Sequence, residues 1–223
     1  MIALGLTGGI GCGKSAVADL LVARGAVLVD ADQVARAVVE PGQPAYRALL
    51  EHFGPGILAP DGTLDRAALA ARAFGSPEEL AALNACTHPA IGQEMARQLA
   101  PLAGTDAVVV VAIPLLTPAH RTTLGLDAVV VVDCPPEVAL ERLVAQRGMD
   151  PADARARIAA QISREARLED ADLVVDNSAD REALAAQVER IWEWVAARRA
   201  TPDGAAGTLS GPPPSPPCAS SRG

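Results

Sequence analysis

The chain has 223 residues, of which 50% are hydrophobic and only 2% aromatic, and its formal net charge is -8. A chain of this length can bury a full core of Val, Leu, Ile and Ala, whereas its scarcity of aromatic rings disfavours a protein that stacks nucleic-acid bases. The negative charge disfavours broad attraction to nucleic acid or to an anionic membrane, so any anion site must be local.

The cysteines and the N-terminus favour an ordinary cytoplasmic protein. Cys12, Cys86, Cys134 and Cys218 lie far apart and lack the spacings of a zinc site or a disulfide framework. No apolar run approaches the length of a membrane span, and the first residues lack the charged start and the cleavage site of a signal peptide. We therefore expect a cytoplasmic location.

Five apolar runs are continuous rather than alternating, which is typical of strands covered on both faces. They span residues 2–6, 26–29, 107–113, 128–132 and 173–175. Helical spacing fills the stretches between them, so strands and helices alternate along the chain. This order predicts an α/β fold with a parallel sheet and right-handed crossovers.

Capping residues mark several helix boundaries. Ser76 and Glu79 form a capping-box pattern, and Asp150, followed by proline, starts another helix. Gly25 and Gly54 are expected to end two earlier helices.

Two connections are too long for plain crossovers and predict insertions that form a substrate site and a lid. Residues 31–105 are expected to hold three or four helices, and residues 135–170 two, with the lid at about 147–168. The folded domain would then span residues 1–200. Residues 201–223 are rich in Pro, Gly and Ser and are expected to be disordered, although their PPPSPP run could also serve as a polyproline ligand.

The segment GLTGGIGCGKS at residues 5–15 places a glycine-rich loop between a predicted strand and a predicted helix. Gly8, Gly13, Lys14 and Ser15 satisfy the P-loop pattern G-x-x-x-x-G-K-[ST]. Backbone N–H groups and the helix N-terminus of such a loop bind phosphate, the lysine reaches the β and γ phosphates, and the serine hydroxyl can ligate Mg²⁺. The flanking strand and helix disfavour the alternative, in which the glycines only make a tight turn.

Cys12 lies inside this loop, and two interpretations stay open. A nearby lysine and a helix N-terminus would lower the pKa of its thiol and make it reactive. Alternatively, cysteine is simply a small residue that fits at this position.

Two aspartates follow the second predicted strand, at the edge where open α/β sheets bind ligands. Asp30 ends the strand and Asp32 follows two residues later. With a usual pKa of about 3.9, a carboxylate is a poor base for an alcohol, so we expect Asp32 to position a hydroxyl group for attack on a phosphate and to accept its proton late. The alternative is that Asp32 only caps a helix over residues 33–40.

Arginines concentrate in the second insertion, where acidic residues alternate with them. An arginine that assists phosphoryl transfer contributes about 10³- to 10⁵-fold in rate, or roughly 4 to 7 kcal/mol, whereas a surface ion pair contributes about 0–1 kcal/mol. Arg142 is the best candidate because it follows a strand and a turn, and Arg147 and Arg157 would arrive on a closing lid. The remaining arginines of this region are expected to form a solvated face with ion pairs to Asp153, Glu165 and Glu169.

A series of motifs runs through residues 1 to about 195: GLTGGIGCGKS, VDADQVAR, FGPGILAPDGTLDRAALAARAF, LNACTHPAI, IPLL, ERLVAQRG, RARIAAQIS and VVDNS. In this order they resemble the bacterial dephospho-coenzyme A kinase family. The resemblance implies a P-loop NTPase-type five-stranded parallel sheet flanked by helices, with a helical acceptor-binding insertion and a lid. It also implies ATP-dependent phosphorylation of the ribose 3′-hydroxyl of dephospho-CoA, the last step of coenzyme A synthesis, with ATP and Mg²⁺.

The resemblance also implies roles for individual residues. The catalytic set is Lys14, Asp32 and Arg142. The ATP-binding set is Gly11, Cys12, Gly13, Lys14, Ser15, Ala16 and, near the adenine, Asn177. The acceptor-binding set is Asp32, Arg36 and His88, although a lone histidine such as His88 also suits a structural role.

The chain departs from the family pattern in two places that bear on the metal. Many relatives carry a glutamate soon after PLL, whereas here Thr117 and Pro118 follow, and Ala112 leaves the third strand without an acidic end. Mg²⁺ would then rely on Ser15, ATP oxygens and water, with Asp30 as a further candidate.

Two other functions stay open. A nucleoside or nucleotide kinase would share the P-loop, the sheet and the lid, and only its acceptor would differ. A nucleotide-dependent switch is disfavoured because the chain lacks the N-K-x-D motif that binds guanine. A lid that excludes water also suits phosphoryl transfer better than the slow hydrolysis of a switch.

Overall fold

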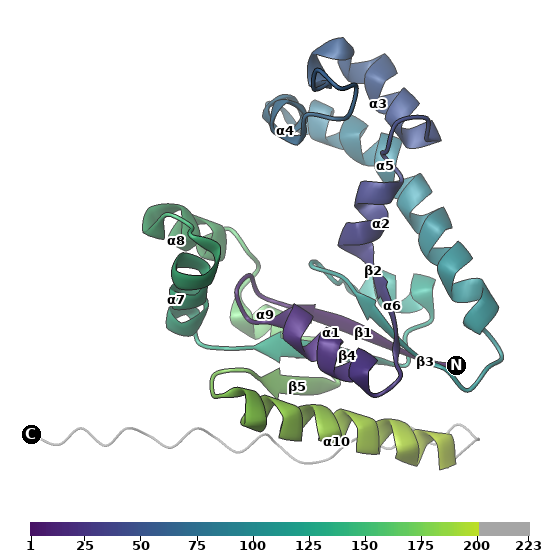
Figure 1. The fold of residues 1–223 in the computed structure, drawn as a ribbon, viewed down its shortest axis with the longest axis vertical. Coiled ribbons are helices and arrows are strands. Elements are labelled where there is room, and N and C mark those ends of the chain that lie inside the picture. The colour runs from purple at the N-terminus through teal and green to yellow at the C-terminus, as the bar shows by residue number, and fades with distance from the viewer. Residues whose placement is uncertain (201–223) are drawn as a thin grey trace, which may run out of the picture.

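The computed structural model describes residues 1–200, and the tail at 201–223 lies outside them. Five parallel strands form one sheet in the order β2-β3-β1-β4-β5 (Figure 1). Every strand that the sequence predicts is present, with ends that differ by at most two residues. The strands are β1 (Ile2–Gly8), β2 (Val27–Asp30), β3 (Val108–Ala112), β4 (Ala128–Asp133) and β5 (Leu173–Asp176).

Helices fill the connections between the strands. Those before β3 are α1 (Lys14–Ala23), α2 (Ala31–Ala37), α3 (Pro44–Phe53), η1 (Pro55–Ile57), α4 (Arg66–Ala73), α5 (Pro77–Leu99) and η2 (Ala100–Leu102). Those after β3 are α6 (Pro118–Leu124), α7 (Pro136–Arg147), α8 (Pro151–Ala159), α9 (Arg164–Glu169) and α10 (Arg181–Ala200).

The first long connection holds four α-helices, within the expected number. The second holds three rather than the two we expected, because the Ser163 side chain accepts a hydrogen bond from the Ala166 N–H and starts the short helix α9. A polar N-cap of this kind can start a helix too short for apolar periodicity to reveal.

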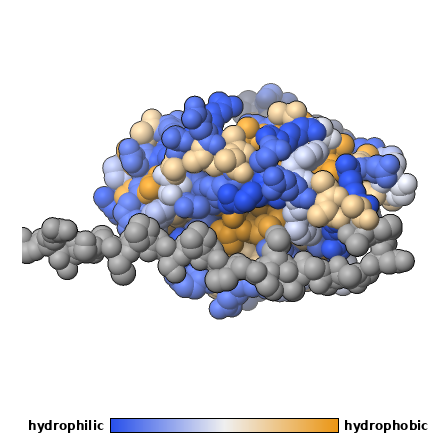
Figure 2. Space-filling model, turned by 90° about the horizontal axis from the view of Figure 1, so that it is seen from below, coloured by the Kyte–Doolittle hydropathy of each residue, from blue (hydrophilic) through white to orange (hydrophobic). Residues whose placement is uncertain are grey.

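Alternate residues of the central strands pack into two cores. Val108 and Val110 of β3 face the core made with α1 and α10, whereas Val109 and Val111 face the core made with α2, α3 and α5. Since both faces of β3 are buried, no polar residue alternates along it, which explains the continuous apolar run. The face in Figure 2 is mostly hydrophilic, with smaller hydrophobic areas between.

Two groups of helices extend from the sheet. In Figure 1, α2 to α5 stand above it and α7 and α8 lie to its left, beyond the loop that joins β1 to α1. Because α2 directly follows β2 and α7 follows β4 after two residues, both groups begin at the carboxyl edge of the parallel strands. Ligands of open α/β sheets bind at this edge.

The predicted helix boundaries are confirmed. Ser76 Oγ accepts the Glu79 N–H at 3.2 Å, and Asp150 Oδ1 accepts the Ala152 N–H at 2.8 Å. Gly54 follows α3 with φ 71°, and Gly25 follows the end of α1 with φ 96°, in the left-handed region that glycine adopts without strain.

Ser76→Ala removes the side-chain cap of α5. We expect the free energy of unfolding to fall by about 1 kcal/mol, because an N–H of the first turn loses its acceptor. For a domain of this size the midpoint of thermal unfolding falls by roughly 2–4 °C. Urea and thermal denaturation measure the change, and Ser76→Asp, which keeps an acceptor, is the matched control. Equal stability of the alanine and aspartate variants would contradict this role of Ser76.

Candidate functional site

The loop between β1 and α1 has a backbone that neighbouring groups approach closely. Gly11 has φ 80° and Gly13 has φ 87°, both left-handed. A Cβ added to Gly11 would lie 2.7 Å from the Ala139 carbonyl oxygen, and one added to Gly13 would overlap Asn177 Nδ2. Glycine is therefore required at both positions for conformation and for space.

Residues from distant segments hold this loop in place. The Cys12 N–H donates to the Gly9 carbonyl at 3.1 Å, and the Cys12 carbonyl accepts from Asn177 Nδ2 at 2.8 Å. The Ile10 N–H donates to Gln161 Oε1 at 2.9 Å, so the segment between α8 and α9 also contacts the loop. Asn177, which we expected near an adenine, is buried and orients a backbone carbonyl of the loop.

Lys14, the first residue of α1, is half-buried near Asp30, which ends β2, and Asp32, which lies in the first turn of α2. Burial lowers the pKa of its ammonium group, while the charges of Asp32 and Asp30 raise it. The sheet thus brings the P-loop lysine and the two aspartates into one electrostatic environment. An ammonium group in this setting can interact strongly with an anion.

The two aspartates have different local roles. Asp30 is the N-cap of α2, and its Oδ1 accepts the Asp32 N–H at 2.8 Å. The alternative in which Asp32 is the cap is therefore wrong, and the helix begins at residue 31 rather than 33. Asp32 is exposed in the first turn, and Arg36, one turn later, lies on the same face of α2. None of the ion pairs within residues 1–200 involves either of these two side chains.

A cleft of about 360 Å³ opens beside the loop. The volume lies within the range of small-molecule sites. Asp32, Arg36 and His88 do not line this cleft. Its walls come from the loop with α1, from α7 and from the segment after β5, and include Gly11, Gly13, Ala16, Arg142, Arg147 and Asn177.

Arg142 carries an unpaired donor at this wall. Its Nη1 is the one buried side-chain nitrogen or oxygen atom within residues 1–200 that has no hydrogen-bond partner, and it lies 3.9 Å from the Cβ position of Gly13. A buried guanidinium donor without an acceptor is costly, and an anion on the loop would satisfy it. The position of this Arg142 donor therefore fits a phosphate group bound to the loop.

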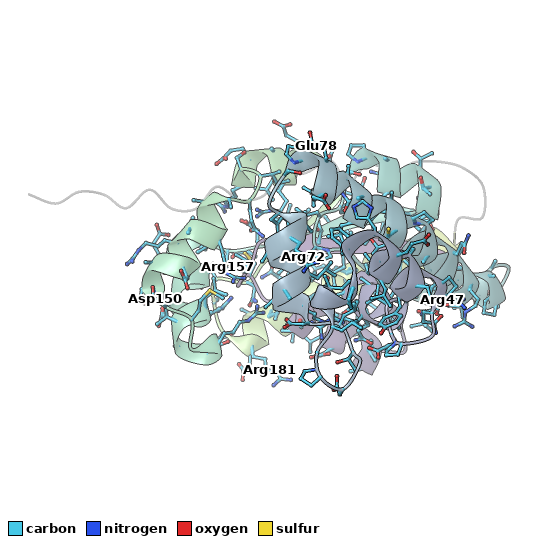
Figure 3. All side chains as sticks on the ribbon, turned by 90° about the horizontal axis from the view of Figure 1, so that it is seen from above. Arg47, Arg72, Glu78, Asp150, Arg157 and Arg181 are labelled. Atoms are coloured by element: carbon cyan, nitrogen blue, oxygen red, sulfur yellow. The ribbon has the colours of Figure 1, made fainter. Side chains whose placement is uncertain are left out.

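The other arginines of the second insertion separate into different environments. Arg147 lines the cleft with Arg142, whereas Arg157 does not. Figure 3 shows Arg157 on the side of α8 that faces the rest of the molecule, with Asp150 on the outer side. Arg155 donates to the Pro151 carbonyl.

Two arginines make contacts that the sequence analysis missed. Arg164 Nε donates at 2.7 Å to the buried carboxylate of Asp133, which ends β4. Arg167 Nη1 would lie 2.9 Å from a Cβ on Gly9. The expected ion pairs with Asp153, Glu165 and Glu169 are absent within residues 1–200, and Arg164 pairs with Asp133 at the sheet edge instead.

His88 is exposed on α5, directly before a proline inside that helix, rather than packed in the core. Because α5 packs against α2, the helix of His88 adjoins the helix of Asp32. Thr117 and Pro118, which interrupt the family pattern, have a local explanation: Thr117 is the N-cap of α6 and Pro118 is its first residue. Residues 1–200 contain no group of three or more His, Cys, Asp or Glu side chains suited to a metal ion.

Cys12 contacts a second buried cysteine. Cys134 Sγ donates to Cys12 Sγ at 3.1 Å, and both side chains are almost fully buried. This hydrogen bond is the main cause that lowers the pKa of Cys12 to about 7, with a smaller contribution from Arg167 and opposite effects of burial and Asp133. The pKa of Cys134 is raised for the same reason. The expected influence of Lys14 is not among these causes.

Comparisons with known proteins agree with the family that the motifs resemble. The dephospho-CoA kinase family matches residues 2–182. A dephospho-CoA kinase of Streptomyces avermitilis is 52% identical over 86% of this chain and 93% of the relative.

Two solved structures are similar to this chain over most of its length. TT1252 from Thermus thermophilus superposes with a TM-score of 0.73 at 31% identity, covering 88% of this chain and 97% of that one. The dephospho-CoA kinase from Campylobacter jejuni superposes with a TM-score of 0.60 at 25% identity, covering 86% and 96%.

Within residues 1–200 no helix combines the length and apolarity needed to cross a bilayer. The glycine-rich loop, its lysine and the neighbouring carboxylates lie at one edge of a five-stranded parallel sheet, as expected, and the family match covers most of the sequence. The chain belongs to the dephospho-CoA kinase family.

Proposed function

We propose that this chain transfers the γ-phosphoryl group of ATP to the ribose 3′-hydroxyl of dephospho-CoA and releases CoA and ADP. Family membership supports the reaction class and both substrates. The observation that carries the proposal is the buried Arg142 donor beside the P-loop, which has no hydrogen-bond partner. Lys14 lies at the same sheet edge, where its ammonium group interacts with the charge of Asp32. We place the reaction, the last step of coenzyme A synthesis, in the cytoplasm.

In this proposal the cleft and the loop bind the nucleotide. The backbone N–H groups of Gly13, Lys14 and Ser15 at the N-terminus of α1 hold the phosphates, whereas that of Cys12 is bonded within the loop. Asn177 keeps the loop in its binding conformation through the Cys12 carbonyl. Arg142 and Arg147 contribute positive charge from α7. Because Asn177 and Gln161 hold the loop, its backbone donors need little reorganisation when ATP binds.

Lys14 and Arg142 stabilise the charge that develops on the transferred phosphoryl group. Its transition state is largely dissociative, so catalysis depends on positioning and on electrostatic stabilisation. The half-buried ammonium group acts in a medium less polar than water, which strengthens its interaction with phosphate oxygens. An arginine that acts in this way contributes about 10³- to 10⁵-fold.

Asp32 orients the attacking hydroxyl group. Because Asp30 uses its carboxylate as the cap of α2, Asp32 is the aspartate whose side chain is available to a substrate. Asp32 accepts a hydrogen bond from the 3′-hydroxyl and takes its proton late, after the bond to phosphorus has begun to form. Arg36, on the same face of α2, and His88, on the adjoining α5, are proposed to contact the acceptor.

Mg²⁺ suits the donor set at the start of α1. Ser15 is exposed in the first helical turn, and its hydroxyl is a hard oxygen ligand of the kind that Mg²⁺ accepts beside phosphate oxygens and water. Asp30 is a weaker candidate because its Oδ1 is committed to the helix cap. The bound ion would neutralise phosphate charge and orient the triphosphate.

In this proposal the two insertions have different roles. Residues 31–105 would hold the acceptor, and the region of about 147–168 would act as a lid that excludes water. Two contacts support the lid assignment: Gln161 accepts from the P-loop and Arg164 pairs with Asp133 at the end of β4. Arg147 and Arg157 would approach the phosphates as the lid closes.

A coupled assay with ATP and dephospho-CoA tests the proposal. We expect ADP to form only in the presence of acceptor, and the product to carry phosphate at the ribose 3′ position in NMR and mass spectra. Phosphorylation of nucleosides or nucleoside monophosphates in preference to dephospho-CoA would assign the chain to the alternative kinase class. Slow hydrolysis that no soluble acceptor stimulates would indicate a switch and contradict transfer.

Asp32→Asn should lower kcat by about 10²- to 10⁴-fold, as expected for loss of an oriented proton acceptor. The amide keeps the size of the side chain, so circular dichroism and the affinity for ATP should remain near wild type. Steady-state kinetics with both substrates measure the effect. Gln33→Ala, an exposed neighbour on α2, is the matched control and should retain full turnover. Wild-type turnover of Asp32→Asn would remove Asp32 from the mechanism.

Arg142→Ala should reduce kcat by about 10³-fold while it weakens ATP binding much less, because the guanidinium group acts mainly on transition-state charge. Arg155→Ala removes the same charge from an exposed position on α8 and should leave both quantities unchanged. Separate measurements of kcat and of the dissociation constant of ATP distinguish the two effects. A loss of ATP affinity alone would make Arg142 a nucleotide anchor.

A further inference from the structure

The sheet brings two cysteines together at the phosphate loop. β1 and β4 are neighbouring parallel strands in which Gly8 pairs with Val132. Cys12 follows β1 within the loop, and Cys134 directly follows β4. Their sulfur atoms lie 3.1 Å apart, whereas the transfer reaction proposed above uses neither thiol.

The environment of this pair differs from that of the other described cysteine. Cys12 and Cys134 are 4% and 3% exposed, so only a small reagent can reach them. The hydrogen bond from Cys134 favours the thiolate of Cys12, whose pKa is lowered to about 7. By contrast, burial and the charge of Glu51 raise the pKa of Cys86, which lies on α5.

We propose that Cys12 and Cys134 form an oxidative modification site whose reagent is a small hydroperoxide and whose product is an intramolecular disulfide at the phosphate loop. The Cys12 thiolate attacks the peroxide, an S–O bond forms, the O–O bond breaks, and water or an alcohol leaves. Cys134 then attacks the sulfenic sulfur. The S–S bond forms as the S–O bond breaks, and the hydroxide leaves as water with the proton of Cys134, so the two sulfurs have lost the two electrons that the peroxide gained.

Closing the disulfide displaces the loop. The sulfur atoms must approach from 3.1 Å to about 2.05 Å. The Cys12 peptide group is held by the Gly9 carbonyl and by Asn177, and Cys12 Sγ already lies 3.1 Å from the Cβ position of Gly9. The loop therefore has little space to accommodate the movement, and the N–H groups of Gly13 and Lys14 shift with it.

A shift of about 1 Å in a binding group can cost about 100-fold in activity. We accordingly expect the oxidised protein to bind ATP at least tenfold more weakly than the reduced protein. The formation of the disulfide does not depend on the identity of the phosphate acceptor. Failure of this inference is therefore distinguishable from failure of the proposed kinase activity.

The experiment treats the full chain with hydrogen peroxide and follows two readouts. Intact-mass and peptide mapping detect the loss of two hydrogen atoms and the Cys12–Cys134 cross-link. Titration with a fluorescent ATP analogue measures nucleotide affinity without requiring turnover. We expect the cross-link and the loss of affinity to develop together, and dithiothreitol to reverse both.

Three variants separate this site from general oxidation. Cys134→Ser should bind ATP normally when reduced and should form no cross-link to Cys12 under peroxide. Cys86→Ser and Cys218→Ser, which change the remaining two cysteines, should respond as the wild type does. A cross-link through Cys86 or Cys218, a stable Cys12 sulfinic acid without any disulfide, or a Cys12–Cys134 disulfide that leaves ATP affinity unchanged would each overturn the proposal.

Discussion

The arrangement of the site depends on the close packing of one glycine-rich loop against its neighbours. Gly11 lies against the Ala139 carbonyl, and Gly13 lies against Asn177 with no space for a Cβ. The resulting bare backbone leads directly into α1, whose N-terminus favours negative charge. Lys14 begins α1 directly after this loop, and Arg142 Nη1 lies 3.9 Å from the Cβ position of Gly13, so a displaced loop would change the position of bound phosphate relative to both cationic groups.

The rest of the fold supplies the loop with partners from segments that are far apart in sequence. The parallel sheet places the ends of β1, β2, β4 and β5 at one edge, and each contributes a different group. β2 brings Asp30 and Asp32, β4 is followed by Cys134 and α7, and β5 is followed by Asn177. The helices inserted after β2 and those that follow β4 start from the same edge, so the acceptor and the nucleotide are proposed to approach the loop from different sides.

Local chemistry made much of this organisation predictable. Continuous apolar runs identified all five strands, and the three central strands are buried on both faces. Ser76, Asp150, Gly25 and Gly54 marked helix boundaries through short-range hydrogen bonds and backbone conformation. The P-loop was recognisable because the spacing G-x-x-x-x-G-K-[ST] is typical of one phosphate-binding backbone conformation. The motifs also identified the family.

Contacts that depend on tertiary structure could not be predicted in the same way. Asp30 rather than Asp32 caps α2, and the difference follows from where the strand ends and the helix begins. Arg164 is one of the arginines for which we expected an ion pair with a nearby acidic residue. It pairs instead with Asp133, 31 residues earlier in the chain. The Cys12–Cys134 contact arises from the parallel pairing of β1 with β4. The two residues are 122 positions apart in sequence, but their sulfur atoms lie 3.1 Å apart.

A crystal structure with a non-hydrolysable ATP analogue and dephospho-CoA tests the central claim most directly. The account predicts that the triphosphate lies on the N–H groups of the loop, that Arg142 Nη1 gains a phosphate oxygen as acceptor, and that the ribose 3′-hydroxyl lies within hydrogen-bond distance of the Asp32 carboxylate. A triphosphate bound away from the loop, or a 3′-hydroxyl oriented away from Asp32 with both substrates present, would contradict it.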